Sequence, residues 1–109
     1  MNWIDLNSEA QLDGLKEASR HKPLVIFKHS TRCAISSMAK SRLERNPQPE
    51  GIDFYYLDLL QHKTLSNKIA EVFTVYHESP QVLLIKNGVC VYDESHSGIQ
   101  MNELVEQAL

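Results

Sequence analysis

One cysteine, Cys33, lies among residues that favour its ionised form. The apolar run 24–27 predicts a strand before it, and a helical pattern begins directly after it. The free amides and the dipole at the start of a helix attract an anion such as a thiolate, which is the nucleophilic form of cysteine. Arg32 adds positive charge, and the Ser36 hydroxyl could donate to the Cys33 sulfur across the first helical turn. These features predict a reactive thiolate rather than merely a small residue that starts a helix.

The position three residues after Cys33 is occupied by Ser36. A dithiol oxidoreductase would carry its second cysteine there, and serine cannot form a disulfide. Cys33 is therefore expected to form a mixed disulfide with another molecule, and a further thiol must then remove that molecule.

The second cysteine, Cys90, falls inside the predicted strand 89–93. A buried thiol in a strand behaves as a small apolar side chain, and this is the favoured interpretation. A resolving cysteine for Cys33 is the alternative, and it requires the two Cα atoms to lie within about 7 Å of each other.

The chain around these residues alternates strand and helix patterns. Strands are predicted at 3–6, 23–28, 52–58, 82–86 and 89–93, and helices at about 9–20, from Cys33 to before Pro47, over 65–73 and over 101–108. The order βαβαβαββα predicts an α/β fold in which a central mixed β-sheet is flanked by helices, in one domain spanning 1–109. Ser8 and Gln11 match a capping box at the first helix, and Asn87-Gly88 predicts a hairpin turn.

The helix after Cys33 has apolar residues with helical spacing, which predicts its buried face. They are Ile35, Met38, Ala39 and Leu43. The charged residues of the same helix are expected to form its solvated face. They are Lys40, Arg42, Glu44 and Arg45.

Composition excludes several classes of protein. A chain of 109 residues with two cysteines is neither a disulfide scaffold nor a four-cysteine zinc protein. A net charge of -3 argues against nucleic-acid binding, and no apolar run is long enough to cross a membrane. Residues 1–5 lack the pattern of a secretory signal, so we expect a cytoplasmic protein with free thiols.

Two further features lie near the predicted site. Ser79-Pro80 directly precedes a strand, which is where a proline fits a sheet, and the bond could be cis. His77 and Glu78 directly precede this pair, and their position alone suggests that they line the same groove as Ser79 and Pro80. His29, four residues before Cys33, could act as a base or charge partner, or be a solvated turn histidine. No histidines have metal-ligand spacing, so no metal site is expected.

The element order, the cysteine at a strand-to-helix junction and the proline before the hairpin together resemble the thioredoxin fold. The sequence 27–36 (Phe-Lys-His-Ser-Thr-Arg-Cys-Ala-Ile-Ser) is similar to the YtxJ-type monothiol bacilliredoxins, whose motif is close to Lys-His-Ser-Thr-x-Cys-Pro-Ile-Ser. Ala34 stands where that family usually has proline. This departure leaves Cys33 and Ser36 in their motif positions.

The resemblance implies that Cys33 removes bacillithiol from S-bacillithiolated proteins. Pro80 would be a cis-proline facing Cys33, Ser79 would bind the thiolated partner through its backbone, and Thr31 would be a further site residue of the motif. Bacillithiol would be a co-substrate and not a bound cofactor, and a separate flavin reductase would reduce the bacillithiol disulfide. The chain has no glycine-rich dinucleotide fingerprint, and we expect a monomer without nucleic-acid or membrane partners.

Two other functions remain open. One is a thioredoxin-like redox sensor or a non-catalytic interaction module. The other is an iron–sulfur-binding protein that resembles monothiol glutaredoxins, but their Cys-Gly-Phe-Ser motif does not match Ala34-Ile35.

Overall fold

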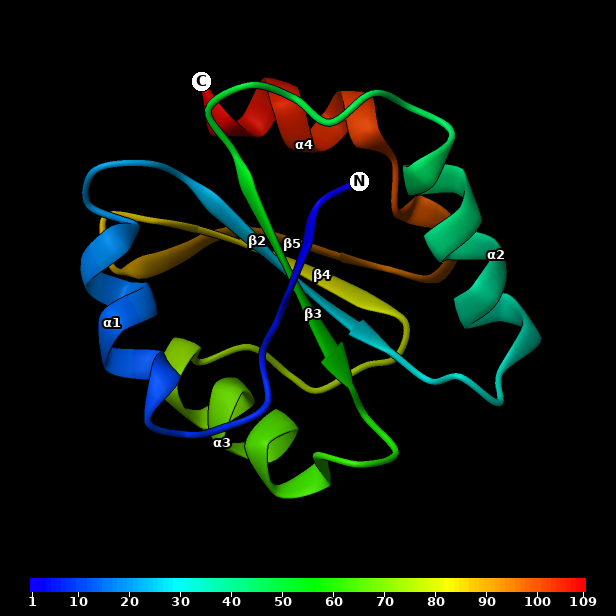
Figure 1. Ribbon diagram of the computed structural model, residues 1–109, viewed down its shortest axis with the longest axis horizontal. Helices are drawn as coiled ribbons and strands as arrows, with labels where there is room; N and C mark the ends of the chain where they lie inside the picture. The colour runs from blue at the N-terminus through cyan, green and yellow to red at the C-terminus, as the bar shows by residue number, and fades with distance from the viewer.

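The computed structural model describes all residues from 1 to 109 and contains one five-stranded sheet with helices on both faces (Figure 1). The strands are β1 Trp3–Asp5, β2 Leu24–His29, β3 Asp53–Asp58, β4 Gln81–Lys86 and β5 Val89–Ser95. The helices are α1 Gln11–Ala18, α2 Ala34–Glu44, α3 Lys63–Phe73 and α4 Met101–Ala108, with a short 3₁₀ turn, η1, at His96–Gly98. The predicted order of strands and helices is confirmed, and η1 is the one element that was not predicted.

The sheet is mixed, as predicted, with the strand order β1-β3-β2-β4-β5. Strands β1, β3 and β2 run parallel, while β4 is antiparallel to both β2 and β5. Lys28 of β2 pairs with Gln81 of β4, so the end of β2 lies beside the beginning of β4. The segment before β4 therefore reaches the same edge of the sheet as the loop that leads to Cys33.

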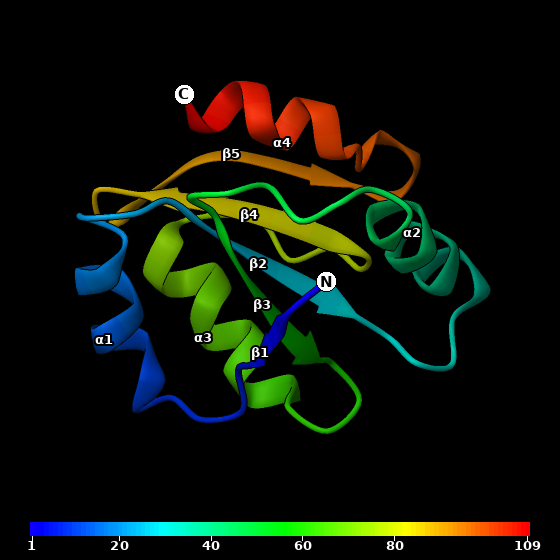
Figure 2. The same cartoon turned by 45° about the horizontal axis from the view of Figure 1, so that its top comes forward.

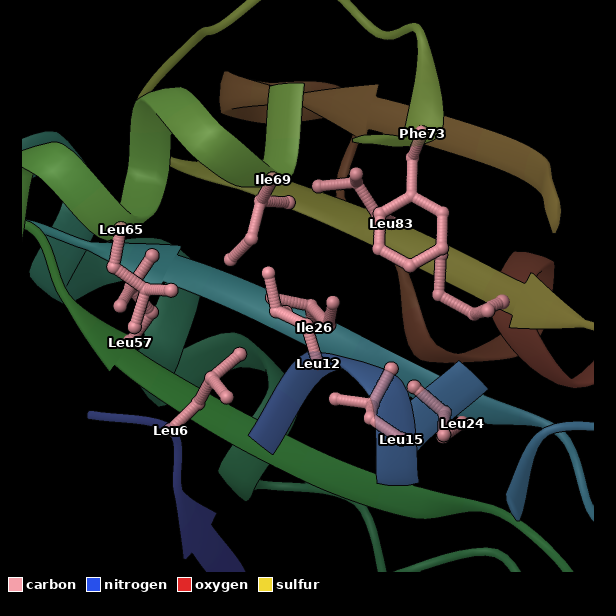
Figure 3. Packing of buried hydrophobic residues seen from close by; sticks show 11 residues of the cluster. Leu6, Leu12, Leu15, Leu24, Ile26, Leu57, Leu65, Ile69, Phe73 and Leu83 are labelled. Atoms are coloured by element: carbon pink, nitrogen blue, oxygen red, sulfur yellow. The ribbon is translucent and has the colours of Figure 1, made fainter. Parts of the chain in front are cut away.

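Helices α1 and α3 lie on one face of the sheet and α2 and α4 on the other (Figure 2), and an apolar cluster on each face holds the layers together. Helices α1 and α3 cover one face, where Leu15 and Ile69 pack on Ile26 in the cluster drawn in Figure 3. Helices α2 and α4 cover the other face, where Leu43 and Leu104 belong to the second cluster. Because β2 is covered on both sides, all six of its residues are buried.

The start of α1 differs from the predicted capping box. The helix begins at Gln11, two residues later than predicted, after a turn at residues 9–10. Gln11 N–H donates to the Ser8 carbonyl and not to the Ser8 hydroxyl. The reciprocal half does form, since Gln11 Oε1 accepts from Ser8 N–H at 3.0 Å. None of the helices has the length and hydrophobicity of a membrane-spanning segment.

Candidate active site

Cys33 is the N-cap residue of α2. Its backbone is extended, with φ -104° and ψ 120°, and its carbonyl accepts the first hydrogen bond of the helix, from Ser37 N–H at 3.0 Å. The amides of residues 34–36 therefore have no acceptor within the helix. The thiol is free and partly exposed, at the end of the helix that favours a negative charge. This geometry matches the predicted position of Cys33 at the junction of a strand and a helix.

The Ser36 hydroxyl, predicted to donate to Cys33, makes its side-chain hydrogen bond with His29 in the structure. Its Oγ lies 2.6 Å from His29 Nδ1 and accepts from Ser30 N–H at 3.0 Å. Ser36 is completely buried, so these two bonds satisfy a hydroxyl that would otherwise be costly to bury. We assign its one proton to His29, which directs it away from the Cys33 sulfur.

His29 is buried and not the solvated turn histidine that the sequence allowed. Its ring stacks on Phe27 with 5.6 Å between ring centroids and lies 5.6 Å from Tyr56. Burial lowers the pKa of His29, and the nearby Lys40 ammonium lowers it further. His29 is therefore held as a neutral acceptor for the Ser36 hydroxyl.

The remaining residues of the resembled motif differ in exposure. Thr31 and Arg32 are exposed in the turn before Cys33, and Arg32 has no carboxylate within ion-pair distance. The Ser79-Pro80 bond is cis, as the resemblance implied, and Pro80 is buried at the start of β4. The Ser79 hydroxyl oxygen is buried without a hydrogen-bond partner. The strand register brings Ser79 and Pro80 to the edge of the sheet where β2 ends.

Cys90 lies toward the other end of the sheet. It pairs with Ile85, next to the hairpin turn, whereas Gln81 of the same strand β4 pairs with the end of β2. Four residues of strand separate these two positions, a distance of about 13 Å. Cys90 packs against the core, and burial raises the pKa of its thiol to about 11. This placement favours a core thiol over a resolving cysteine.

The predicted buried face of α2 is wrong in two of its four positions. Ala39 and Leu43 are buried, but Ile35 and Met38 are exposed by 55% and 63% of their surface. The inward position is taken by Ser36, because His29 and Ser30 satisfy its hydroxyl.

The exposed side of α2 borders a hollow of about 420 Å³ between this helix and η1. It is lined by Ile35, Met38, Arg42, His96 and Ser97. Arg42 is not simply solvated, since its guanidinium donates to the carbonyls of Ile99 and His96 and ties α2 to η1. Two apolar side chains are thus presented to solvent within five residues of Cys33.

A buried polar cluster beside the site was not predicted. Lys28 is fully buried in β2, and its Nζ lies 3.2 Å from the Ser66 carbonyl oxygen and 3.3 Å from His77 Nδ1. The signal was present in the sequence, because Lys28 belongs to the predicted strand 23–28 and directly follows its apolar run 24–27. No group of three or more histidine, cysteine or acidic residues is placed to hold a metal ion.

A thiol at the start of α2, a cis-proline on the adjacent strand and a five-stranded mixed sheet place the chain in the thioredoxin-fold class of thiol redox proteins. Solved structures agree with this assignment. Schistosoma mansoni thioredoxin is similar with a TM-score of 0.74 and 19% identity, over 97% of this chain and 92% of that one. Thioredoxin Mala s 13 of Malassezia sympodialis gives 0.73 and 16%, over 96% and 90%. These likenesses establish the fold.

A more similar structure is described as having a thioredoxin fold and is suggested to be an oxidoreductase. It is 32% identical, with a TM-score of 0.84, over 96% of this chain and 92% of that one. The family profile of the monothiol bacilliredoxins, BrxC, matches residues 4–104. The chain belongs to the monothiol bacilliredoxin family.

Proposed function

We propose that this protein removes bacillithiol from S-bacillithiolated proteins by a monothiol mechanism. The observation that carries the proposal is the pairing of a free, partly exposed Cys33 at the start of α2 with a buried Ser36 in place of a second thiol. Cys90 is toward the far end of the sheet, so no thiol of the same chain is placed to resolve a disulfide at Cys33. Family membership supports the same reaction.

The reaction begins when the Cys33 thiolate attacks the bacillithiol sulfur of the client's mixed disulfide. The bond between this sulfur and the client's sulfur breaks, and the client leaves as a thiolate that takes a proton from water. Cys33 is then joined to bacillithiol. A second bacillithiol thiolate attacks that bacillithiol sulfur, which frees Cys33 and forms bacillithiol disulfide, so one disulfide is consumed and one is produced.

Two features of the site support this reaction. Cys33 lies at the free amides of the first turn of α2, and the exposed Arg32 directly precedes it. The backbone of Ser79, just before β4, is available to a client segment that binds in an extended, strand-like manner. Bacillithiol acts as co-substrate.

The test is turnover of a bacillithiolated client protein in the presence of free bacillithiol. We expect the wild-type protein and Cys90→Ser to release the client thiol at similar rates, and Cys33→Ser to be inactive. Undiminished turnover by Cys33→Ser would refute the proposal. Turnover with a different low-molecular-weight thiol, and none with bacillithiol, would refute the choice of co-substrate.

A further inference from the structure

Lys28 is a buried cation without a carboxylate partner. It lies at the end of β2, and no part of its side chain is exposed. Its Nζ donates to the Ser66 carbonyl at 3.2 Å and contacts His77 Nδ1 at 3.3 Å. A lysine ammonium is seldom fully buried unless a specific arrangement requires it, because desolvation of the charge is costly. The two contacts of Lys28 are therefore the place to look for its role.

The contact with Lys28 defines the state of the His77 ring. An ammonium can only donate, so Nδ1 of His77 must accept and the ring carries its proton on Nε2. The Ser66 hydroxyl lies 3.1 Å from the same nitrogen. Contacts from β2 and from α3 thus meet at one ring atom and hold His77 in a single orientation.

His77 belongs to the segment that enters β4, and this segment is held at a second point. The side chain of Gln81, which is buried, donates to the Tyr76 carbonyl at 2.9 Å and accepts from Glu78 N–H at 3.3 Å. Residues 76–79 are therefore held by Lys28 through a side chain and by Gln81 through the backbone. Such a double attachment orders a short loop that has no strand or helix of its own.

The segment 76–79 ends at Ser79 and is followed by Pro80, at the edge of the sheet where β2 runs toward Cys33. We propose that Lys28 is a positioning residue, which acts through His77 to fix the backbone of Glu78 and Ser79 against which a thiolated client docks. This inference rests on the proposed function, because it names what sets the affinity of the same site for its client. Lys28 itself takes no part in the chemistry at Cys33.

The arrangement also makes docking sensitive to pH. The charged groups that face His77 are Lys28 from β2, Lys63 from α3 and Glu78 of its own segment. Burial, and then the Lys28 charge, lower the pKa of His77, so the ring is neutral at neutral pH. A proton gained in acid occupies Nδ1, removes the acceptor of Lys28 and sets two cations against each other. The segment is then released and client affinity falls.

The experiment uses Lys28→Met, His77→Ala and the double variant, with Lys68→Met as a matched control on the exposed side of α3. His77 is exposed, so His77→Ala tests the same link without the change to the core that Lys28→Met makes. Each single variant should raise KM for a bacillithiolated client protein about tenfold with little change in kcat, since a charge-assisted contact is lost. The double variant should be no worse than either single one. Alkylation of Cys33 by iodoacetamide should keep its wild-type rate.

The pH dependence and backbone exchange give two further readouts. Wild-type KM should stay constant above about pH 6.5 and rise as the pH falls below it, because the pKa of His77 is lowered, and His77→Ala should show a flatter profile. Hydrogen exchange at residues 76–79 should be about tenfold faster in both single variants than in Lys68→Met. Unchanged exchange in the single variants, or single effects on KM that simply add in the double variant, would overturn the inference. A wild-type protein without turnover but with the expected exchange results would refute the proposed function and leave Lys28 as the residue that orders this segment.

Discussion

His29 Nδ1 and Ser36 Oγ are joined by a 2.6 Å hydrogen bond between the last residue of β2 and the first turn of α2. Both side chains are buried, and the bond locks the helix that begins after Cys33 onto the central strand. Ser36, which occupies the place of a second thiol, is thus a structural anchor as well as the residue that leaves Cys33 without an internal partner.

Removal of this anchor should be costly. Ser36→Ala leaves His29 Nδ1 and Ser30 N–H without their shared partner, and we expect a loss of about 1–3 kcal/mol in the free energy of unfolding. Urea unfolding measures the change. Ser37→Ala, at an exposed position of the same helix, is the matched control and should change this free energy by less than about 0.5 kcal/mol. Equal stabilities of the two variants would show that the bond contributes nothing.

Stability should fall in mild acid because His29 is held neutral. Its folded-state pKa lies below the ordinary value, so its contribution is fully present above about pH 6.5 and is lost as the pH falls through the lowered pKa. His77 has a lowered pKa and contributes with the same sign. The free energy of unfolding, measured from pH 7 downward, should decrease less steeply in His29→Gln than in the wild type. Parallel curves would contradict the assignment of a neutral His29.

The free energy of unfolding in mildly alkaline solution should depend on the protonation of Lys28. Burial lowers the pKa of Lys28 to about 8 from 10.5. Below about pH 8 the buried charge therefore decreases the free energy of unfolding, and this free energy rises as Lys28 loses its proton. Between about pH 8 and about pH 9.5 we expect the wild type to gain about 1.5 kcal/mol from this group. Lys28→Met should show no such gain in urea unfolding. An equal gain of stability in Lys28→Met would show that a group other than Lys28 is responsible for it.

The outward direction of Met38 can be tested against an inward neighbour on the same helix. Met38→Ser should alter the free energy of unfolding by less than about 0.5 kcal/mol, because Met38 is 63% exposed. Leu43→Ala, at a position with no exposure, should cost about 3 kcal/mol. If Met38→Ser proved as damaging as Leu43→Ala, the helix would be rotated relative to the structure described above.

The sequence predicted the order of the strands and helices because each follows a regular hydrophobic period. It did not predict the rotation of α2. Hydrophobicity alone assigns Ile35 and Met38 to the core, whereas the position of Ser36 depends on His29, which is seven residues away and on another element. The role of Lys28 was missed for a related reason, since its partners Ser66 and His77 come from distant parts of the chain.

The residues of the candidate site could be predicted from the sequence, whereas the hydrogen bonds among them could not. The position of Cys33 follows from a local boundary between two patterns, and the cis bond before Pro80 was implied by resemblance. Which atom accepts the Ser36 proton is a property of three-dimensional packing, and no local pattern contains it.

The monothiol mechanism requires that Cys33 alone carries the low-molecular-weight thiol. Mass spectrometry of the protein after exposure to bacillithiol disulfide measures which cysteine is modified. We expect one bacillithiol adduct, on Cys33, that is released by free bacillithiol, with Cys90 unmodified because its thiol is half-buried and its pKa is raised to about 11. An adduct on Cys90, or a disulfide between Cys33 and Cys90 in place of the adduct, would contradict the account.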